Sequence, residues 1–404
     1  MSRVILHCDC NSFFASVETA LNPAYKNVPM AVCGSESDRH GIVLAKNELA
    51  KKYNIQTAET VYSAKRKCPT LVIAEPHYEE YKKYSRAVNR IYARYTDMIE
   101  PFGIDESWLD VTASKRIFGS GLEIAERIRK EVREELGITV SIGVSFNKVF
   151  AKLGSDYKKP DAVTVIDEEN YKNIVFPLPV SDLLFVGKKT SEALISMGIK
   201  TIGALSSASE ALLCARFGKM GEMLHRYSNG LDDSPVCPES EDSKSISNGL
   251  TFRRDLTALE DCRVAIDYLT EQLANKMKKQ GQMCRTVSIT IKDNLLKTVQ
   301  RQRPTESPTD TSRDVASLAF SILKDEWHCD YPIRMITVTV SNLVRRDSVT
   351  EQMSFFDETK VEQREKDKKR DNAIDNIRQK FGVEAIVNGA VLVSDIGIRE
   401  EKKK

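Results

Sequence analysis

Short apolar runs alternate with amphipathic stretches over the first 145 residues of the chain. The apolar runs, whose length and flanking residues predict strands, occupy residues 3–9, 99–104, 108–111 and 138–144. Two longer stretches, residues 80–97 and 121–136, repeat apolar residues at helical spacing. The resulting order β-α-β-β-α-β is the ferredoxin-like plan, so we predict an α+β fold with residues 11–76 inserted after the first strand.

The later segments have different patterns. Residues 183–205 place glycines at 187 and 198 among short helical stretches, which is typical of a helix-hairpin-helix; the alternative is a plain helical turn. Residues 236–247 are polar and acidic and predict an interdomain linker. Residues 248–345 alternate helices with strands, the helices at 262–281 and 312–327 and the strands at 286–292 and 333–343. We therefore predict a multidomain α+β protein with a second α+β module.

Acidic residues lie at the ends of predicted strands. Asp105 and Glu106 fall at or near a tight turn between two strands, and Asp9 ends the first strand. Neighbouring carboxylates repel and raise one pKa unless a hard cation lies between them. A single acid is better explained as a solvated loop residue, but three at strand ends of one sheet favour a divalent metal site. Asn11 or Ser12 is a good N-cap for the next helix, whose free amides could bind a metal-bound triphosphate.

Composition narrows the class of protein. The 404 residues suffice for roughly two to four domains, and 41% of them are hydrophobic, so the chain can bury several cores. Its nine cysteines lack paired C-x-x-C motifs, which argues against zinc. No apolar run approaches a membrane span and the start lacks a signal-peptide pattern, so we expect a cytoplasmic protein without a membrane partner. Residues 244–346 carry 17 Lys and Arg against 12 Asp and Glu, an excess that suits phosphate contacts but also occurs on ordinary solvated surfaces.

Two motifs carry a family resemblance. Residues 9–18 (DCNSFFASVE) and 103–110 (GIDESWLD) resemble the signature pair of the Y-family (translesion) DNA polymerases, most closely the DNA polymerase IV (DinB-like) branch. The resemblance extends from the N-terminus to about residue 345. It implies a ferredoxin-like palm (1–10 and 77–166), small inserted fingers (11–76), a helix-hairpin-helix thumb (167–235), a linker (236–247), an α+β little finger (248–345) and a C-terminal tail (346–404).

The resemblance also implies roles for single residues. Asp9, Asp105 and Glu106 would be the catalytic acids and would hold two Mg²⁺ ions per active site, with the backbone carbonyl of Cys10 as a further ligand. The residues implied to bind the incoming nucleotide are Ser12, Phe13, Phe14, Lys51 and Lys159. Phe14 has the steric-gate position, where an aromatic ring collides with a ribose 2′-hydroxyl. The alternative for Phe13 and Phe14 is a place in the core, which we accept for Phe13; for Lys159 it is a helix-dipole contact.

The nucleotide-binding segment departs from the family pattern at two positions. The family commonly has Thr or Ser where this chain has Ala45, and Tyr where it has Glu48, so two expected triphosphate contacts are absent. A carboxylate beside a triphosphate would be repelled. We therefore expect Glu48 to point away from the triphosphate.

DNA and a sliding clamp are further implied partners. Gly187, Lys188 and Lys189 would bind DNA phosphates, although a lysine replaces the usual second glycine of the motif. The tail segment resembles the peptide that binds the bacterial sliding clamp (β clamp); its residues are Gln352, Met353, Ser354, Phe355 and Phe356. The alternative is a hydrophobic segment that packs on its own domain.

The expected function is DNA-directed DNA synthesis past damaged template, with primer–template DNA and dNTPs as substrates and a monomeric enzyme. No part of the chain is left over for a proofreading exonuclease, so we expect errors to persist. Two alternatives stay open. A nucleotidyl cyclase shares the palm and its acids but needs neither the hairpin nor the clamp peptide, and a non-catalytic DNA-binding or clamp-binding regulator would keep both but could lose the acids.

Overall fold

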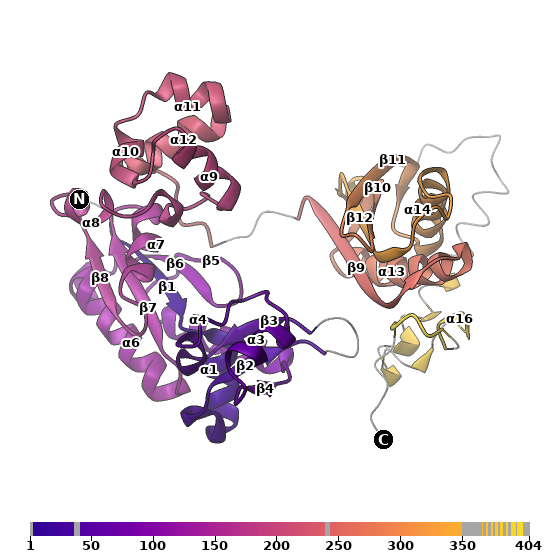
Figure 1. The fold of residues 1–404 in the computed structure, drawn as a ribbon, viewed down its shortest axis with the longest axis horizontal. Coiled ribbons are helices and arrows are strands. Elements are labelled where there is room, and N and C mark those ends of the chain that lie inside the picture. Colours follow the sequence, from indigo (N-terminus) through magenta and orange to yellow (C-terminus); the bar gives the residue numbers. More distant parts are fainter. Residues whose placement is uncertain are drawn as a thin grey trace. The chain divides into compact units, whose positions relative to one another are not determined.

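The computed structural model describes residues 3–35, 41–238 and 243–349, and in shorter pieces parts of 366–398. Contacts between residues divide the chain into two compact units, 1–34 with 42–240 and 35–41 with 241–404 (Figure 1). Each unit has its own hydrophobic core. No helix of the described residues is both long enough and apolar enough to cross a membrane.

The first unit is built on a five-stranded sheet with the order β5-β6-β1-β7-β8 (Figure 1). The strands are β1 (Ile5–Cys10), β5 (Ile99–Pro101), β6 (Glu106–Asp110), β7 (Val140–Ser145) and β8 (Val163–Ile166). The central strand β1 runs antiparallel to both β6 and β7, and β8 is parallel to β7. The first four strands in this order have the ferredoxin-like topology, which confirms the predicted fold class.

Two helices cover one face of this sheet, α4 (Tyr78–Tyr92) and α6 (Gly121–Leu136). A capping box between Ser120 and Glu123 starts α6 at the predicted residue. Helix α4 ends five residues before the predicted residue 97. The Thr96 side chain forms hydrogen bonds in the turn into β5. Its hydroxyl donates to the Asp110 carbonyl at 2.7 Å and accepts from the Met98 amide at 3.1 Å.

Helix α7 (Lys148–Tyr157) lies close to the other face of the sheet. A Cβ added at Gly143 of β7 would lie 1.8 Å from the Ala151 carbonyl oxygen, and one added at Gly154 would lie 2.9 Å from the Gly143 Cα. Only glycine permits this approach of two backbones. Because side chains alternate along β1, Ile5, His7 and Asp9 face α7, whereas the cysteines of β1 enter the core under α4 and α6.

The insert between β1 and α4 forms a small layer with the strand order β3-β2-β4. Its elements are α1 (Phe13–Leu21), the 3₁₀ turn η1 (Pro23–Asn27), β2 (Met30–Cys33), β3 (Val43–Lys46), α2 (Glu48–Lys51), α3 (Val61–Lys67) and β4 (Val72–Ala74). The short helix α5 (Lys115–Phe118) follows β6. After β8 the chain is helical, with α8 (Tyr171–Val175), η2 (Val180–Asp182), α9 (Lys188–Ser196), α10 (Ile202–Ser206), α11 (Glu210–Phe217) and α12 (Lys219–Ser228).

The start of the predicted linker packs on the sheet. Val236 is 1% exposed and lies in one apolar cluster with Ile5 and Trp108. The Cys237 amide donates to Glu100 Oε2 at 2.8 Å. Residues 236 and 237 of the predicted linker therefore pack against the sheet of the first unit, where Val236 covers apolar side chains.

The second unit contains a sheet with the strand order β11-β10-β12-β9, covered by α13 (Leu259–Lys279) and α14 (Ser312–Glu326). The strands are β9 (Ser245–Leu256), β10 (Gln282–Asp293), β11 (Thr298–Thr309) and β12 (Ile333–Ser341), and β13 (Val344–Arg345) pairs with β10. The turn η3 (Arg346–Ser348) follows. The predicted module is confirmed as α+β, but the two edge strands were missed. Strand β11 is polar and contains Pro304 and Pro308, which edge strands tolerate.

The end of the tail belongs to the second unit. Val391 of α16 (Gly389–Leu392), Ile396 and Ile398 are buried in its core. The Arg253 amide donates to the Ile396 carbonyl at 3.0 Å, and Arg254 forms an ion pair with Asp395 at 2.7 Å. Part of the predicted tail is therefore a structural component of this unit.

Candidate active site

The site lies in a cavity of about 360 Å³ at the end of β1. Its lining joins the start of α1, strand β3, the β5–β6 turn and the loop after α7, and consists of Asp9, Cys10, Asn11, Ser12, Phe13, Phe14, Leu44, Ala45, Lys46, Lys51, Thr57, Ile104, Asp105, Glu106 and Lys159. All nine residues predicted to serve catalysis, metal binding or nucleotide binding are in this lining. A larger hollow of about 800 Å³, lined by Asp97, Asp110 and their neighbours, contains none of them.

Strand pairing brings the three acids together. The antiparallel register of β1 and β6 places Asp9 opposite Glu106. Asp105 is the last residue of the β5–β6 turn, and its carbonyl accepts a hydrogen bond from the Cys10 amide at 3.0 Å. Gly103 in the same turn has φ +98°, a backbone conformation that favours glycine. The turn predicted from the sequence therefore contains Asp105, whereas Glu106 already belongs to β6.

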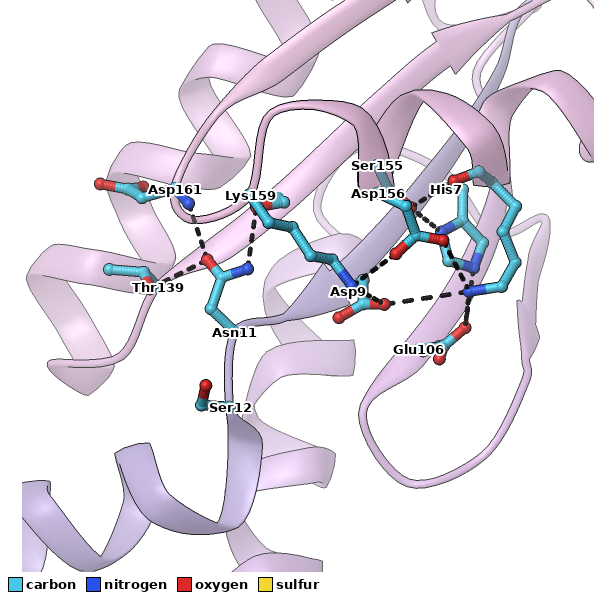
Figure 2. A network of polar contacts seen from close by, with 12 residues as sticks. His7, Asp9, Asn11, Ser12, Glu106, Thr139, Ser155, Asp156, Lys159 and Asp161 are labelled. Atoms are coloured by element: carbon cyan, nitrogen blue, oxygen red, sulfur yellow. Dashed lines mark hydrogen bonds and ion pairs between the residues drawn. The ribbon is translucent and has the colours of Figure 1, made fainter. Parts of the chain in front are cut away.

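Two lysines contact Asp9 and Glu106, and Figure 2 labels Lys159 beside Asp9. Lys159 Nζ lies 2.6 Å from Asp9 Oδ2 and 2.7 Å from Asp156 Oδ1. Lys152 Nζ lies 2.6 Å from Glu106 Oε2 and 3.9 Å from Asp9 Oδ2. The sequence reasoning chose Lys159 but missed Lys152. The signal was its spacing, since residues 152 and 156 lie four apart and share one face of the predicted helix.

His7 was also missed. It is fully buried on β1, with Nδ1 2.8 Å from the Ser155 hydroxyl and Nε2 3.2 Å from Glu106 Oε2. Its ring meets the Trp108 ring edge-on, with centroids 5.1 Å apart. Burial lowers the pKa of His7, so the imidazole is neutral at pH 7. His7 lies two residues before Asp9, so both side chains are on the same face of the strand, and this spacing was the signal in the sequence.

The three carboxylates do not titrate alike. Burial raises the pKa of Asp105 to about 6, and the nearby charges of Asp9 and Glu106 add to this shift. Burial raises the pKa of Asp9 as well, although Lys159 opposes it. Burial also acts to raise the pKa of Glu106, but hydrogen bonds from His7 and Lys152 outweigh it and lower this pKa to about 2.

The donor set fits a hard divalent cation. Carboxylate oxygens and a backbone carbonyl are the ligands that Mg²⁺ takes in proteins, and concentrated negative charge raises its affinity. Among the described residues no side chain donates a hydrogen bond to the Asp105 carboxylate, which accepts one from its own backbone amide. In the part of the chain that the structure describes, no three or more His, Cys, Asp or Glu side chains are already arranged around a metal position. Asp9 and Glu106 form ion pairs with lysines instead.

The residues expected to bind the triphosphate line the same cavity as the acids. Ser12, one of the two residues predicted as the N-cap, is the N-cap residue of α1, with φ 47° and no capping hydrogen bond from its side chain. Its hydroxyl donates to Glu48 Oε1 at 3.2 Å, and Lys51 Nζ lies 2.5 Å from the same oxygen. We expected Glu48 to point away from the triphosphate. It does not line the cavity, but its carboxylate contacts Ser12 and Lys51, which do. Lys46 lines the cavity too and was not singled out; burial, with Lys51 nearby, lowers its pKa.

The aromatic residues of α1 differ in exposure. Phe13 is 3% exposed and belongs to the core of the first unit, as the alternative interpretation held. Phe14 is partly exposed and stacks on Tyr81, with ring centroids 4.1 Å apart and 11° between the planes. The Tyr81 hydroxyl donates to Glu18 at 2.5 Å, which fixes the ring beneath Phe14.

The other predicted binding residues lie elsewhere. Gly187 precedes α9 without a side-chain cap, and Lys188 and Lys189 are exposed on its first turn. Gly198, with φ +84°, turns the chain from α9 towards α10, so the helix-hairpin-helix arrangement is present. The clamp-binding residues 352–356 lie outside the described residues.

Comparison with known proteins gives consistent matches. Models described as the impB/mucB/samB family and its C-terminal domain match residues 8–156 and 243–355, and a model described as DNA polymerase-iota, thumb domain, matches 181–232. DNA polymerase IV of Acetivibrio thermocellus is 45% identical over 98% of this chain and 99% of its own length. DNA polymerase IV of Moorella thermoacetica is 36% identical over 98% and 97%. A solved Y-family DNA polymerase chimera has the same fold, with TM-score 0.76 and 23% identity over 85% of this chain and 99% of its own.

The raised pKa of Asp105 predicts a pH-dependent cost to stability. Between the unfolded value of 3.8 and about 6 the folded protein retains a proton that the unfolded chain has lost, so stability falls as pH rises through this window. Asp105→Asn should therefore stabilise the protein in EDTA at pH 8 by about 1 kcal/mol more than at pH 5, allowing for solvent screening. Urea unfolding at both pH values measures this difference. Asp110→Asn, a change outside the cavity, is the control, and an equal gain at both pH values would contradict the prediction.

Proposed function

The chain belongs to the impB/mucB/samB family of Y-family DNA polymerases, in the DNA polymerase IV branch, and from this premise we propose error-prone translesion synthesis by two-metal-ion nucleotidyl transfer. The observation that carries the proposal is the convergence of Asp9, Asp105 and Glu106 on one cavity whose lining also contains lysines. The carboxylates suit cations, and the lysines suit a triphosphate. The boundaries given above for palm, fingers, thumb, linker and little finger stay predictions.

In this proposal the acids hold the metals. Asp9, Asp105 and Glu106, with the Cys10 carbonyl, would bind two Mg²⁺ ions. When bound, the ions supply activation of the primer 3′-hydroxyl and neutralise charge on the leaving pyrophosphate. Lys159 and Lys51 would bind the triphosphate, each exchanging a carboxylate, of Asp9 or Glu48, for a phosphate oxygen. Ser12 and Phe13 would shape the nucleotide pocket, and Phe14 would lie under the sugar.

DNA would be held through its phosphates. The uncapped start of α9 offers backbone amides beside Lys188 and Lys189, and Gly187 leaves room for a phosphate because nothing lies within 4 Å of a Cβ added there. Within the second unit, residues 244–346 carry 17 Lys and Arg against 12 Asp and Glu, which suits contacts with DNA phosphates. Small fingers enclose the new base pair loosely, which favours tolerance over selectivity. The described elements are all accounted for without an exonuclease, so we infer that this chain does not excise errors.

The two alternative functions have less support. A nucleotidyl cyclase has no use for the helix-hairpin-helix that residues 181–232 form and match. A non-catalytic regulator would not need three acids and three lysines, Lys46, Lys51 and Lys159, in a shared cavity. Primer extension with Mg²⁺ on undamaged and abasic templates separates polymerase from both.

Loss of a catalytic acid should abolish extension. Asp9→Ala or Asp105→Ala is expected to leave less than about 1% of parental extension, because removing a ligand disrupts metal binding. Primer–template affinity, measured by fluorescence anisotropy, should stay within about threefold, since phosphate contacts elsewhere hold the DNA. Asp110→Asn, from the same motif but outside the cavity, is the matched control. Substantial extension by either alanine variant would exclude the proposed metal site.

Phe14→Ala should relax sugar selection. Without the ring, a ribose 2′-hydroxyl meets no obstacle, so the preference for dNTP over rNTP is expected to fall at least about tenfold in single-nucleotide kinetics. Phe14→Tyr keeps the ring and should keep the preference. Unchanged rNTP exclusion in the alanine variant would place the gate at another residue.

The clamp proposal is tested by processivity. A polymerase held by a limited number of salt-sensitive contacts dissociates readily, and a tether raises its local concentration at the primer end. Replacing Gln352, Phe355 and Phe356 with alanine should shorten products made with a loaded clamp and leave synthesis without a clamp unchanged. Thr350→Ala, outside the five-residue segment, is the control. Parental affinity of the triple variant for the clamp in calorimetry would mean that the segment does not bind it.

A further inference from the structure

Asn11 is a buried polar residue to which the proposed mechanism gives no role. It directly follows β1, is 5% exposed, and lines the cavity. Its side-chain oxygen accepts hydrogen bonds from the Asp161 amide at 2.8 Å and the Thr139 hydroxyl at 3.0 Å, and its side-chain nitrogen donates to the Ser141 hydroxyl at 2.8 Å (Figure 2). One amide thus connects the end of β1, the segment entering β7 and the loop between α7 and β8.

The contact with Asp161 fixes the loop that carries Lys159. Asp161 lies two residues beyond Lys159 and has φ +56°. Its backbone is held by Asn11 on one side, and its carboxylate is held on the other by Arg129 at 3.1 Å and by Arg133, both from α6. Among the described residues, the ion-pair partners of the Lys159 ammonium are the carboxylates of Asp9 and Asp156. The position of Lys159 therefore depends on the anchoring of Asp161.

The Asn11 side chain is not needed to join the strands. The Asn11 backbone amide already donates to the Thr139 carbonyl at 2.9 Å, and the register of β1 with β7 continues to Cys10 and Val140. The Asn11 carbonyl accepts from the Ser16 hydroxyl at 2.6 Å, which serves the first turn of α1. The backbone of Asn11 thus serves the sheet and the helix, and its side-chain oxygen serves the loop.

We propose that Asn11 is a positioning residue that holds the loop of Lys159 in place, so that the ammonium reaches both Asp9 and the triphosphate of the incoming nucleotide. This inference rests on the proposed role of Lys159 in binding the triphosphate. Removing the Asn11 oxygen leaves the Asp161 amide without its partner and lets the loop move. Because placement of a charged group governs its contribution, nucleotide affinity should suffer before the chemical step does.

The test measures dNTP affinity for the full-length protein on a chain-terminated primer–template, by fluorescence titration, together with kcat on an extendable primer. Asn11→Ala is expected to weaken dNTP binding about tenfold, the equivalent of roughly 1.4 kcal/mol, and to change kcat by less than about threefold. Asn11→Ser also removes the amide oxygen and adds no charge to the cavity, so it should weaken dNTP binding to a similar extent. Ser141→Ala removes only the partner of the Asn11 nitrogen and should also stay within about threefold.

A double-mutant cycle separates positioning from general damage. If Asn11 acts through Lys159, adding Asn11→Ala to Lys159→Ala weakens dNTP binding by less than about twofold more. A full tenfold loss in that background, or parental affinity of Asn11→Ala itself, would overturn the inference. Should Asn11→Ala fail to fold, Asn11→Ser decides: parental dNTP affinity of that variant contradicts the role of the acceptor oxygen. Primer extension by the parent protein tests the proposed function separately. If the parent does not extend primers, the proposed function and the inference about Asn11 both fail.

Discussion

Three carboxylates share one partly buried cavity, and their mutual repulsion is the constraint that the surrounding structure has to satisfy. The cost is visible in Asp105, whose pKa is raised to about 6. The protein offsets it with hydrogen bonds and cations brought from other elements, namely His7 from β1 and two lysines from α7 and the loop after it. Charge of this density is unfavourable for folding alone and useful for binding cations, which is the usual balance at an active site.

Much of the site could be predicted because it depends on strand order. Once the β-α-β-β-α-β pattern is recognised, β1 must lie beside the strand that starts at Glu106, so Asp9 and the Asp105–Glu106 pair have to meet. The roles of Phe14 and Lys51 came from the family resemblance. His7 and Lys152 were missed for a physical reason: a histidine in an apolar run and a lysine on a helix usually have structural or solvated places, and only the packing of α7 on β1 brings them to Glu106.

The fold was less predictable where burial comes from distant parts of the chain. Strand β11 is polar because it lies at a sheet edge, so neither alternation nor hydrophobicity marked it. Val236 stands in a polar segment, and Ile396 lies beyond a long charged stretch, yet each is buried by a surface formed more than a hundred residues earlier. Local patterns describe neighbours along the chain, whereas these residues are defined by neighbours in space.

The glycine contact between α7 and β7 gives the two lysines unequal freedom. Gly143 and Gly154 bring the helix so close to the sheet that it cannot shift without losing van der Waals contact. The backbone position of Lys152 relative to the sheet is therefore fixed. Lys159 lies past the end of that helix, on a loop. Glu106 therefore has a permanent counterion, and Asp9 has an exchangeable one. When a stronger anion arrives, the site can give up one positive charge to it while the other remains in place.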